Sequence, residues 1–115
     1  MNKNASFVCR FINACRGIKS AFMSESSIKT HTIIALFVLL MAYSLGIRGV
    51  WLALLVILIT QVLSLELINT ALEYLCDLVH PEYSEKIKKI KDMAAGAVLI
   101  VSCGALIAAV IFILH

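Results

Sequence analysis

The sequence has few residues that interrupt helices and no obvious cysteine framework. Pro81 is its single proline, and only five glycines occur among 115 residues. Proline breaks the helical hydrogen-bond ladder and glycine weakens it, so their scarcity permits long uninterrupted helices. The cysteines form no Cys-x-x-Cys pair, and no histidine lies at zinc-ligand spacing from them, which argues against a zinc site or a disulfide scaffold. We interpret all four as small apolar residues: Cys9, Cys15, Cys76 and Cys103.

Several functional motifs are also missing. The chain contains no GxxxxGK[ST] phosphate loop, no glycine-rich kinase loop and no HRD-type catalytic segment. These absences exclude the common soluble nucleotide-binding motifs. The net charge of +3 is modest and no basic tract is interleaved with aromatic residues, so nucleic acid is not an expected partner.

Apolar residues are abundant instead. They make up 62% of the chain, and the mean hydropathy is +0.99, whereas soluble domains are about half apolar. A helix needs about 20 mainly apolar residues to cross a bilayer. We therefore predict one all-α membrane domain over residues 1–115, with a polar loop at 76–92 between the last two of three membrane helices: 31–47, 50–78 and 93–114.

Residues 4–24 are predicted to form a helix of a different kind. Basic residues fall largely between apolar ones that recur every three or four positions, which is typical of an amphipathic helix lying in the membrane interface. The N-terminal segment and the 76–92 loop hold nine of the ten Lys and Arg residues, all except Arg48. Basic residues near a membrane favour the cytoplasm, so the N-terminus is predicted to be cytoplasmic and the C-terminus external.

The most informative stretch is residues 66–73, at the inner end of an uncharged run. Glu66, Asn69 and Glu73 lie three, four and seven positions apart, so on a helix they share one face, with Thr70 beside it. The two carboxylates are then roughly 10 Å apart along the axis. Ionisable groups this deep in a membrane are costly and usually mark a site. We interpret these residues as functional.

Other charged groups are predicted on the same side of the membrane. Glu25 follows the first helix among small polar residues, and its pattern alone suggests a turn residue or a helix start. Lys91 and Asp92 precede the last membrane helix. Carboxylates with a lysine suit Mg²⁺-dependent phosphoryl transfer from ATP to a lipid hydroxyl. A cation or proton carrier, or a helix-packing subunit, would also place carboxylates here, and spacing alone leaves these alternatives open.

The motifs resemble those of the prokaryotic diacylglycerol kinase family, which includes undecaprenol kinases. The stretch Glu66-Leu-Ile-Asn69-Thr-Ala-Leu-Glu73 is similar to the family's E-x-x-N-[ST]-[AS]-[IL]-E motif. Supporting matches cover nearly the whole chain: Gly17–Phe22, Glu25, His31, Asp77-Leu78, Pro81–Tyr83 and Lys91–Leu99.

The resemblance implies roles for individual residues. Glu66 would be the general base, with Asn69 orienting groups in the same site. Glu25 and Glu73 would hold the Mg²⁺ of Mg-ATP. Phosphate contacts would come from Lys91 and Asp92, and four residues would lie near the nucleotide: Glu82, Tyr83, Ser84 and Glu85.

The resemblance also implies a homotrimer in the bacterial inner membrane, with neighbouring subunits sharing each active site. ATP would be the phosphoryl donor, and the acceptor would be undecaprenol or diacylglycerol. His31 and the run 94–97 are more similar to the undecaprenol kinase branch. Two positions depart from the family pattern, because Asn13 replaces an aromatic residue and Ser84 occupies a position where some members have histidine.

Overall fold

The computed structural model describes residues 6–115, which form four helices. They are α1 (Phe7–Ser24), α2 (Ser26–Ser44), α3 (Gly49–Val79) and α4 (Glu85–Leu114). The predicted helix over 4–24 is thus found from Phe7, while residues 4 and 5 lie outside the described part. Ser6 accepts a hydrogen bond from the backbone N–H of Cys9 at 3.3 Å, which caps the start of α1.

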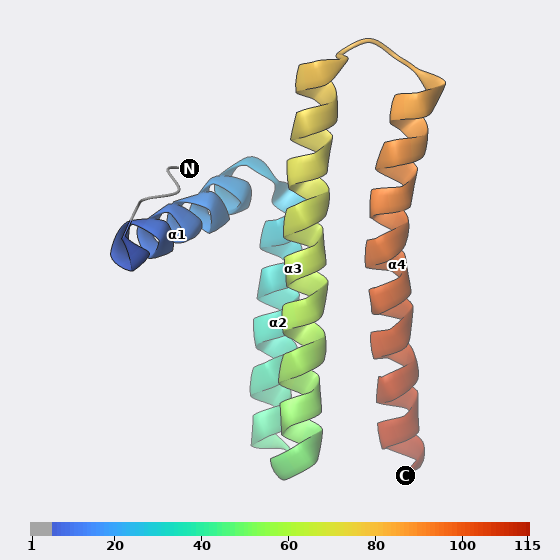
Figure 1. Cartoon of the computed structure of the whole chain (residues 1–115). Helices are drawn as coiled ribbons and strands as arrows, with labels where there is room; N and C mark the ends of the chain where they lie inside the picture. Colours follow the sequence, from blue (N-terminus) through green and yellow to red (C-terminus); the bar gives the residue numbers. More distant parts are fainter. Residues whose placement is uncertain (1–5) are drawn as a thin grey trace.

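Helix α3 is central to the arrangement, because it contacts each of the other three helices. In Figure 1, α2 runs beside α3, α4 lies on another side of α3, and α1 projects at a steep angle from the start of α2. The α1–α2 junction therefore lies beside α3 well away from either of its ends, at the depth of the predicted polar face.

Three helices are long and apolar enough to cross a membrane: α2, α3 and α4. Few of the described side chains are buried within the chain, and most large apolar ones are exposed. The buried set includes one carboxylate and one hydroxyl besides its four apolar members, Ala21, Ile28, Ala42 and Cys76. Apolar helix surfaces of this kind suit lipid or neighbouring helices.

Helix α2 differs in its limits from the predicted span 31–47. It begins at Ser26, immediately after Glu25, and ends at Ser44. The earlier end results from a turn in which Gly46 has a φ of +88°, a conformation that glycine adopts at low cost. Arg48 stabilises this turn, because its Nη1 donates to the carbonyl of Tyr43 at 2.6 Å and its guanidinium lies over the Tyr43 ring.

The polar loop predicted at 76–92 is much shorter in the structure. Helix α3 continues to Val79 and α4 begins at Glu85, so the connection is 80–84. The residues after Ser84 are rich in lysine, which favours helix, and Lys88 pairs with Asp92 four positions later at 2.8 Å. Polarity indicated a loop, whereas these side chains extend α4 beyond its apolar segment.

Candidate functional site

Glu66 lies on α3, facing the start of α2, and only 6% of its surface is exposed. Ser27 Oγ donates to Glu66 Oε1 at 3.0 Å, and His31 Nδ1 lies 2.5 Å from Oε2. Both partners are on α2, which runs beside α3 at this depth. The predicted functional carboxylate is therefore buried against polar groups from a second helix.

The two oxygens of this carboxylate differ in their surroundings. Oε1 accepts the Ser27 hydroxyl, whereas Oε2 has no aligned hydrogen-bond donor within residues 6–115. The nearest polar atom to Oε2 is His31 Nδ1, which lies within ion-pair distance of it. A carboxylate oxygen has two lone pairs, so Oε2 can accept a further hydrogen while it remains in contact with His31.

Asn69 and Glu73 continue the polar face towards the end of α3. Asn69 Nδ2 donates to Glu73 Oε1 at 3.4 Å, which confirms that these two side chains lie together. The Asn69 Oδ1 atom is buried without a partner among the described residues. Thr70, also buried, donates its hydroxyl back to the Glu66 carbonyl at 3.0 Å. Its hydroxyl therefore has its hydrogen-bond partner within α3.

Glu25 lies in the extended residue between α1 and α2, where its side chain is half-buried. Its backbone N–H donates to the Ala21 carbonyl at 2.9 Å, while its carboxylate makes no cap to α2. No group of three acidic, histidine or cysteine side chains in the described residues is arranged to hold a metal. Mg²⁺ commonly takes only one or two protein carboxylates, a number that Glu25 and Glu73 can supply. Glu66 Oε2 and Asn69 Oδ1 are buried without a hydrogen-bond partner among residues 6–115, so either can accept a hydrogen from a hydroxyl donor.

Lys91 and Asp92, predicted as neighbours in one site, contact different partners. Lys91 Nζ lies 2.7 Å from Asp77 Oδ1 on α3, and Asp92 pairs with Lys88. Lys91 precedes the apolar segment of α4, and its hydrogen bond to Asp77 raises the pKa of the ammonium above its ordinary value. Asp77 follows Glu66 by 11 residues, so Lys91 lies roughly 16 Å along α3 from the buried carboxylate.

The remaining predicted nucleotide contacts are in and beside the loop 80–84. Glu82 and Tyr83 are exposed, as is Glu85 at the start of α4. Ser84 is half-buried, and its carbonyl accepts the N–H of Lys88 at 2.9 Å. The loop joins α3 and α4 at the end of the pair where α4 begins (Figure 1). Glu66 precedes this loop on α3 by about four helical turns.

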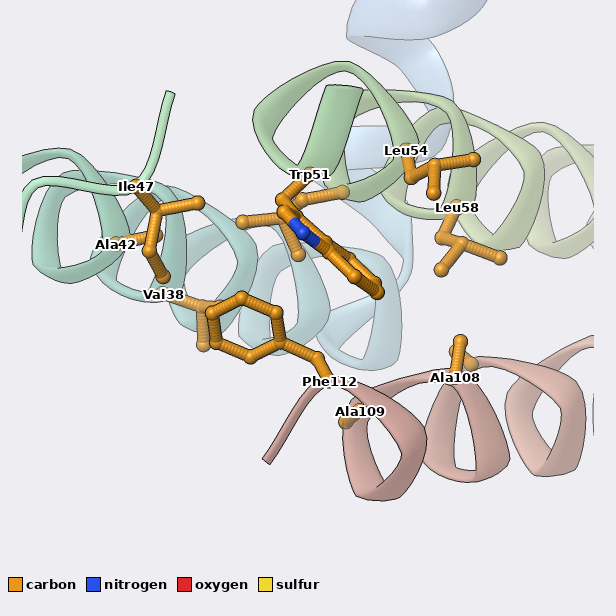
Figure 2. A pocket seen from close by; sticks show the side chains of 11 residues that line it. Val38, Ala42, Ile47, Trp51, Leu54, Leu58, Ala108, Ala109 and Phe112 are labelled. Atoms are coloured by element: carbon orange, nitrogen blue, oxygen red, sulfur yellow. The ribbon is translucent and has the colours of Figure 1, made fainter. Parts of the chain in front are cut away.

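An apolar groove runs between α2, α3 and α4. One part contains Trp51 and Phe112, whose rings pack edge to face 4.9 Å apart, and Figure 2 shows both side chains beside it. A second part extends to His31. The two parts have five lining residues in common, Val38, Leu55, Leu58, Ala105 and Ala109. The groove therefore connects the Trp51 end of the helices with the residue beside Glu66.

The structure adds three residues to the predicted site: Ser27, His31 and Asp77. In the sequence, Ser27 indicated only a helix start, and His31 and Asp77 contributed only to the family motifs. Ser27 precedes the predicted span 31–47, so the sequence did not place it on one helix face with His31. Because α2 begins at Ser26, the two residues are four positions apart on one helix and share a face.

Comparison with known proteins bears on this arrangement. The model of the family described as prokaryotic diacylglycerol kinase matches residues 12–113. The chain is 35% identical to a Synechocystis diacylglycerol kinase over 93% of its own length, and it spans 65% of the length of that relative. It is 32% identical to the Bacillus subtilis undecaprenol kinase and 30% identical to the Escherichia coli diacylglycerol kinase.

Coverage is high for the last two relatives. The aligned regions take in 89% and 87% of this chain respectively, and 85% of each relative. Three helices long enough to span a membrane and a buried glutamate in the predicted motif agree with the resemblance found in the sequence. The chain belongs to the prokaryotic diacylglycerol kinase family.

Proposed function

We propose that this chain, as a member of a family of lipid kinases, transfers the γ-phosphoryl group of Mg-ATP to the hydroxyl of a membrane lipid. The observation that carries the proposal is the buried Glu66 carboxylate. Its Oε2 has no hydrogen-bond donor among residues 6–115, and it lies beside His31, which lines the end of an apolar groove. The relatives are named as kinases, which does not favour the alternative interpretations of this chain as a cation or proton carrier or as a helix-packing subunit.

In this reaction the lipid hydroxyl oxygen attacks the γ-phosphorus, and the bond between that phosphorus and the β–γ bridging oxygen breaks. Glu66 Oε2 accepts the hydroxyl proton as the new O–P bond forms, and ADP leaves with the bridging oxygen. A general base of this kind contributes about 10²–10⁴-fold to a rate. The burial of Glu66 keeps bulk water away from the base, which disfavours hydrolysis of ATP.

Other residues of the site would bind and orient the nucleotide. Glu25 and Glu73 are the proposed Mg²⁺ ligands, and the ion when bound neutralises charge on the phosphates. Lys91 and Asp92 contact the nucleotide's phosphates and hold the site together, with Lys91 supplying a positive charge. Asn69 orients groups beside Glu66. The contacts along the nucleotide come from the residues of the α3–α4 connection: Glu82, Tyr83, Ser84 and Glu85.

The acceptor is proposed to be undecaprenol or diacylglycerol, with its tail among the helices and its hydroxyl at Glu66. The mainly apolar side chains that line the groove support a hydrocarbon tail there, because both surfaces are removed from water when they pack together. His31 and residues 94–97 favour undecaprenol. Relatives named for each lipid have similar identity to this chain, so identity does not choose between them.

We also propose a homotrimer in the bacterial inner membrane, with the N-terminus in the cytoplasm and α1 lying in the interface. The separation of about 16 Å between Glu66 and Lys91 within one chain supports a site shared between subunits. In a shared site, Lys91 of one subunit can act with Glu66 of its neighbour. The exposed apolar faces of α2–α4 leave surface for such contacts.

The test is transfer of labelled γ-phosphate from ATP by the protein purified in mixed micelles with Mg²⁺. Undecaprenol and diacylglycerol are offered separately and together. Label on either lipid supports the proposal, and the ratio of the two kcat/KM values identifies the preferred acceptor. Absence of label on both lipids, with folded protein, would contradict the proposed function.

A further inference from the structure

Ser27 and His31 lie one turn apart on α2 and each is beside a different oxygen of Glu66. The Ser27 hydroxyl reaches Oε1 at 3.0 Å, and His31 Nδ1 is 2.5 Å from Oε2. Residues four apart on a helix project from the same face. One face of α2 therefore contacts both carboxylate oxygens of Glu66 on α3.

A glutamate side chain has three rotatable bonds, so an unsupported carboxylate can rotate away from a reacting group. Correct orientation of catalytic groups accounts for a large part of rate enhancement, and a misplacement of about 1 Å can cost on the order of a hundredfold. The Glu66 carboxylate receives its side-chain contacts from α2 within the described residues. Its orientation thus depends on those two neighbours.

We propose that His31 is a positioning residue for phosphoryl transfer, which holds Glu66 Oε2 towards the acceptor hydroxyl while Ser27 holds Oε1. This inference rests on the proposed role of Glu66 as the base. His31 acts through Glu66, and its contact atom is Nδ1.

The exposure of His31 supports this assignment. Its side chain is 45% exposed although it contacts a carboxylate that is almost fully buried. The same residue lines the apolar groove between α2, α3 and α4. His31 therefore lies between the groove and Glu66, at the place where an acceptor hydroxyl carried by a lipid tail would meet the base.

The experiment compares His31→Asn with His31→Phe in the labelled-phosphate assay, with kcat and both KM values measured. An Asn amide nitrogen can occupy nearly the position of Nδ1, whereas Phe keeps the ring and removes the nitrogen. We expect His31→Phe to lower kcat by at least about tenfold with the KM for ATP unchanged, and His31→Asn to stay within about threefold of wild type. If His31→Phe fails to fold, His31→Gln replaces it, because its longer side chain places the amide beyond Nδ1, and the same loss is expected.

Ser27→Ala supplies a second, independent test. Two residues that hold the same carboxylate should not affect kcat independently. The fold-loss in kcat of the double variant Ser27→Ala/His31→Phe should therefore be smaller than the product of the fold-losses of the two single variants. A fold-loss in the double variant equal to the product of the two single fold-losses would overturn the proposal. So would turnover by His31→Phe within about twofold of wild type, since orientation effects are larger.

The thermal midpoint in detergent distinguishes a positioning role of His31 from a purely structural one. Equal losses of kcat in His31→Asn and His31→Phe, accompanied by matching falls in the midpoint, would overturn the positioning role. His115→Asn is the matched control, because the His115 ring lies tilted 5.7 Å from the Trp51 ring, at the end of the groove away from Glu66. This substitution should leave kcat unchanged. A wild-type protein without kinase activity would contradict the proposed function, whereas an active wild type with fully active His31 variants would contradict this inference alone.

Discussion

Lys91 on α4 and Asp77 on α3 form an ion pair, with 2.7 Å between Nζ and Oδ1. The pair joins the two longest helices close to the loop 80–84. Lys91 is therefore not held by Asp92, its neighbour in sequence, which pairs with Lys88 on the same helix. The lysine proposed to contact phosphate thus lies against α3 in this structure.

This pair leads to a prediction that separates stability from activity. Lys91→Ala should lower kcat/KM for ATP on the order of a hundredfold, since it removes a charge that would face the phosphates. Asp77→Asn should cause a smaller loss and only a slight fall in thermal midpoint, because exposed ion pairs stabilise little. Kinetics and thermal unfolding of both variants check this. Equal kinetic effects of the two variants would show that Lys91 acts only through its pair with Asp77.

Glu66→Gln should reduce turnover by about 10²–10⁴-fold, the range expected for loss of a general base. Glutamine has nearly the same shape and retains an oxygen to accept the Ser27 hydroxyl, so folding and binding of ATP should persist. Phosphate transfer is measured together with equilibrium binding of ATP and the thermal midpoint. Near-normal turnover by this variant would disprove the assignment of Glu66 as base.

Glu25→Gln and Glu73→Gln should each increase the Mg²⁺ concentration that gives half-maximal activity, by about tenfold, because each removes one negative oxygen ligand from a cation that uses few protein ligands. Activity is titrated with Mg²⁺ at fixed ATP. Tyr74→Phe, a change at an exposed side chain next to Glu73 on α3, is a control that should leave the Mg²⁺ dependence unchanged. Unaltered dependence in both test variants would exclude these residues as ligands.

Ala105→Phe should fill the groove at a position shared by its two parts. We expect the KM for the lipid acceptor to rise by about tenfold while the KM for ATP stays unchanged, because a bulky ring would exclude part of the hydrocarbon tail. The matched control is Ala53→Phe, an exposed alanine of α3 that does not line the groove. If both variants have the same KM values as wild type, the tail does not occupy this groove.

Much of the fold could be predicted from the sequence because helices depend on local pattern. Uncharged apolar stretches identified all three long helices, and the predicted span 50–78 nearly coincides with α3 at Gly49–Val79. The limits of α4 were less predictable. Polar residues after Ser84 suggested a loop, yet lysine-rich segments also form helices, and composition alone does not distinguish the two.

The class of protein, the family motif and the shared face of Asn69 and Glu73 could be predicted from residue type and helical spacing. The groups that contact Glu66 and Lys91 could be identified only once the helices were packed together. Ser27 is 39 positions from Glu66, and Lys91 is 14 from Asp77. Helical periodicity fixes which side chains share a face, but the rotation and register of one helix against another depend on packing along their whole length.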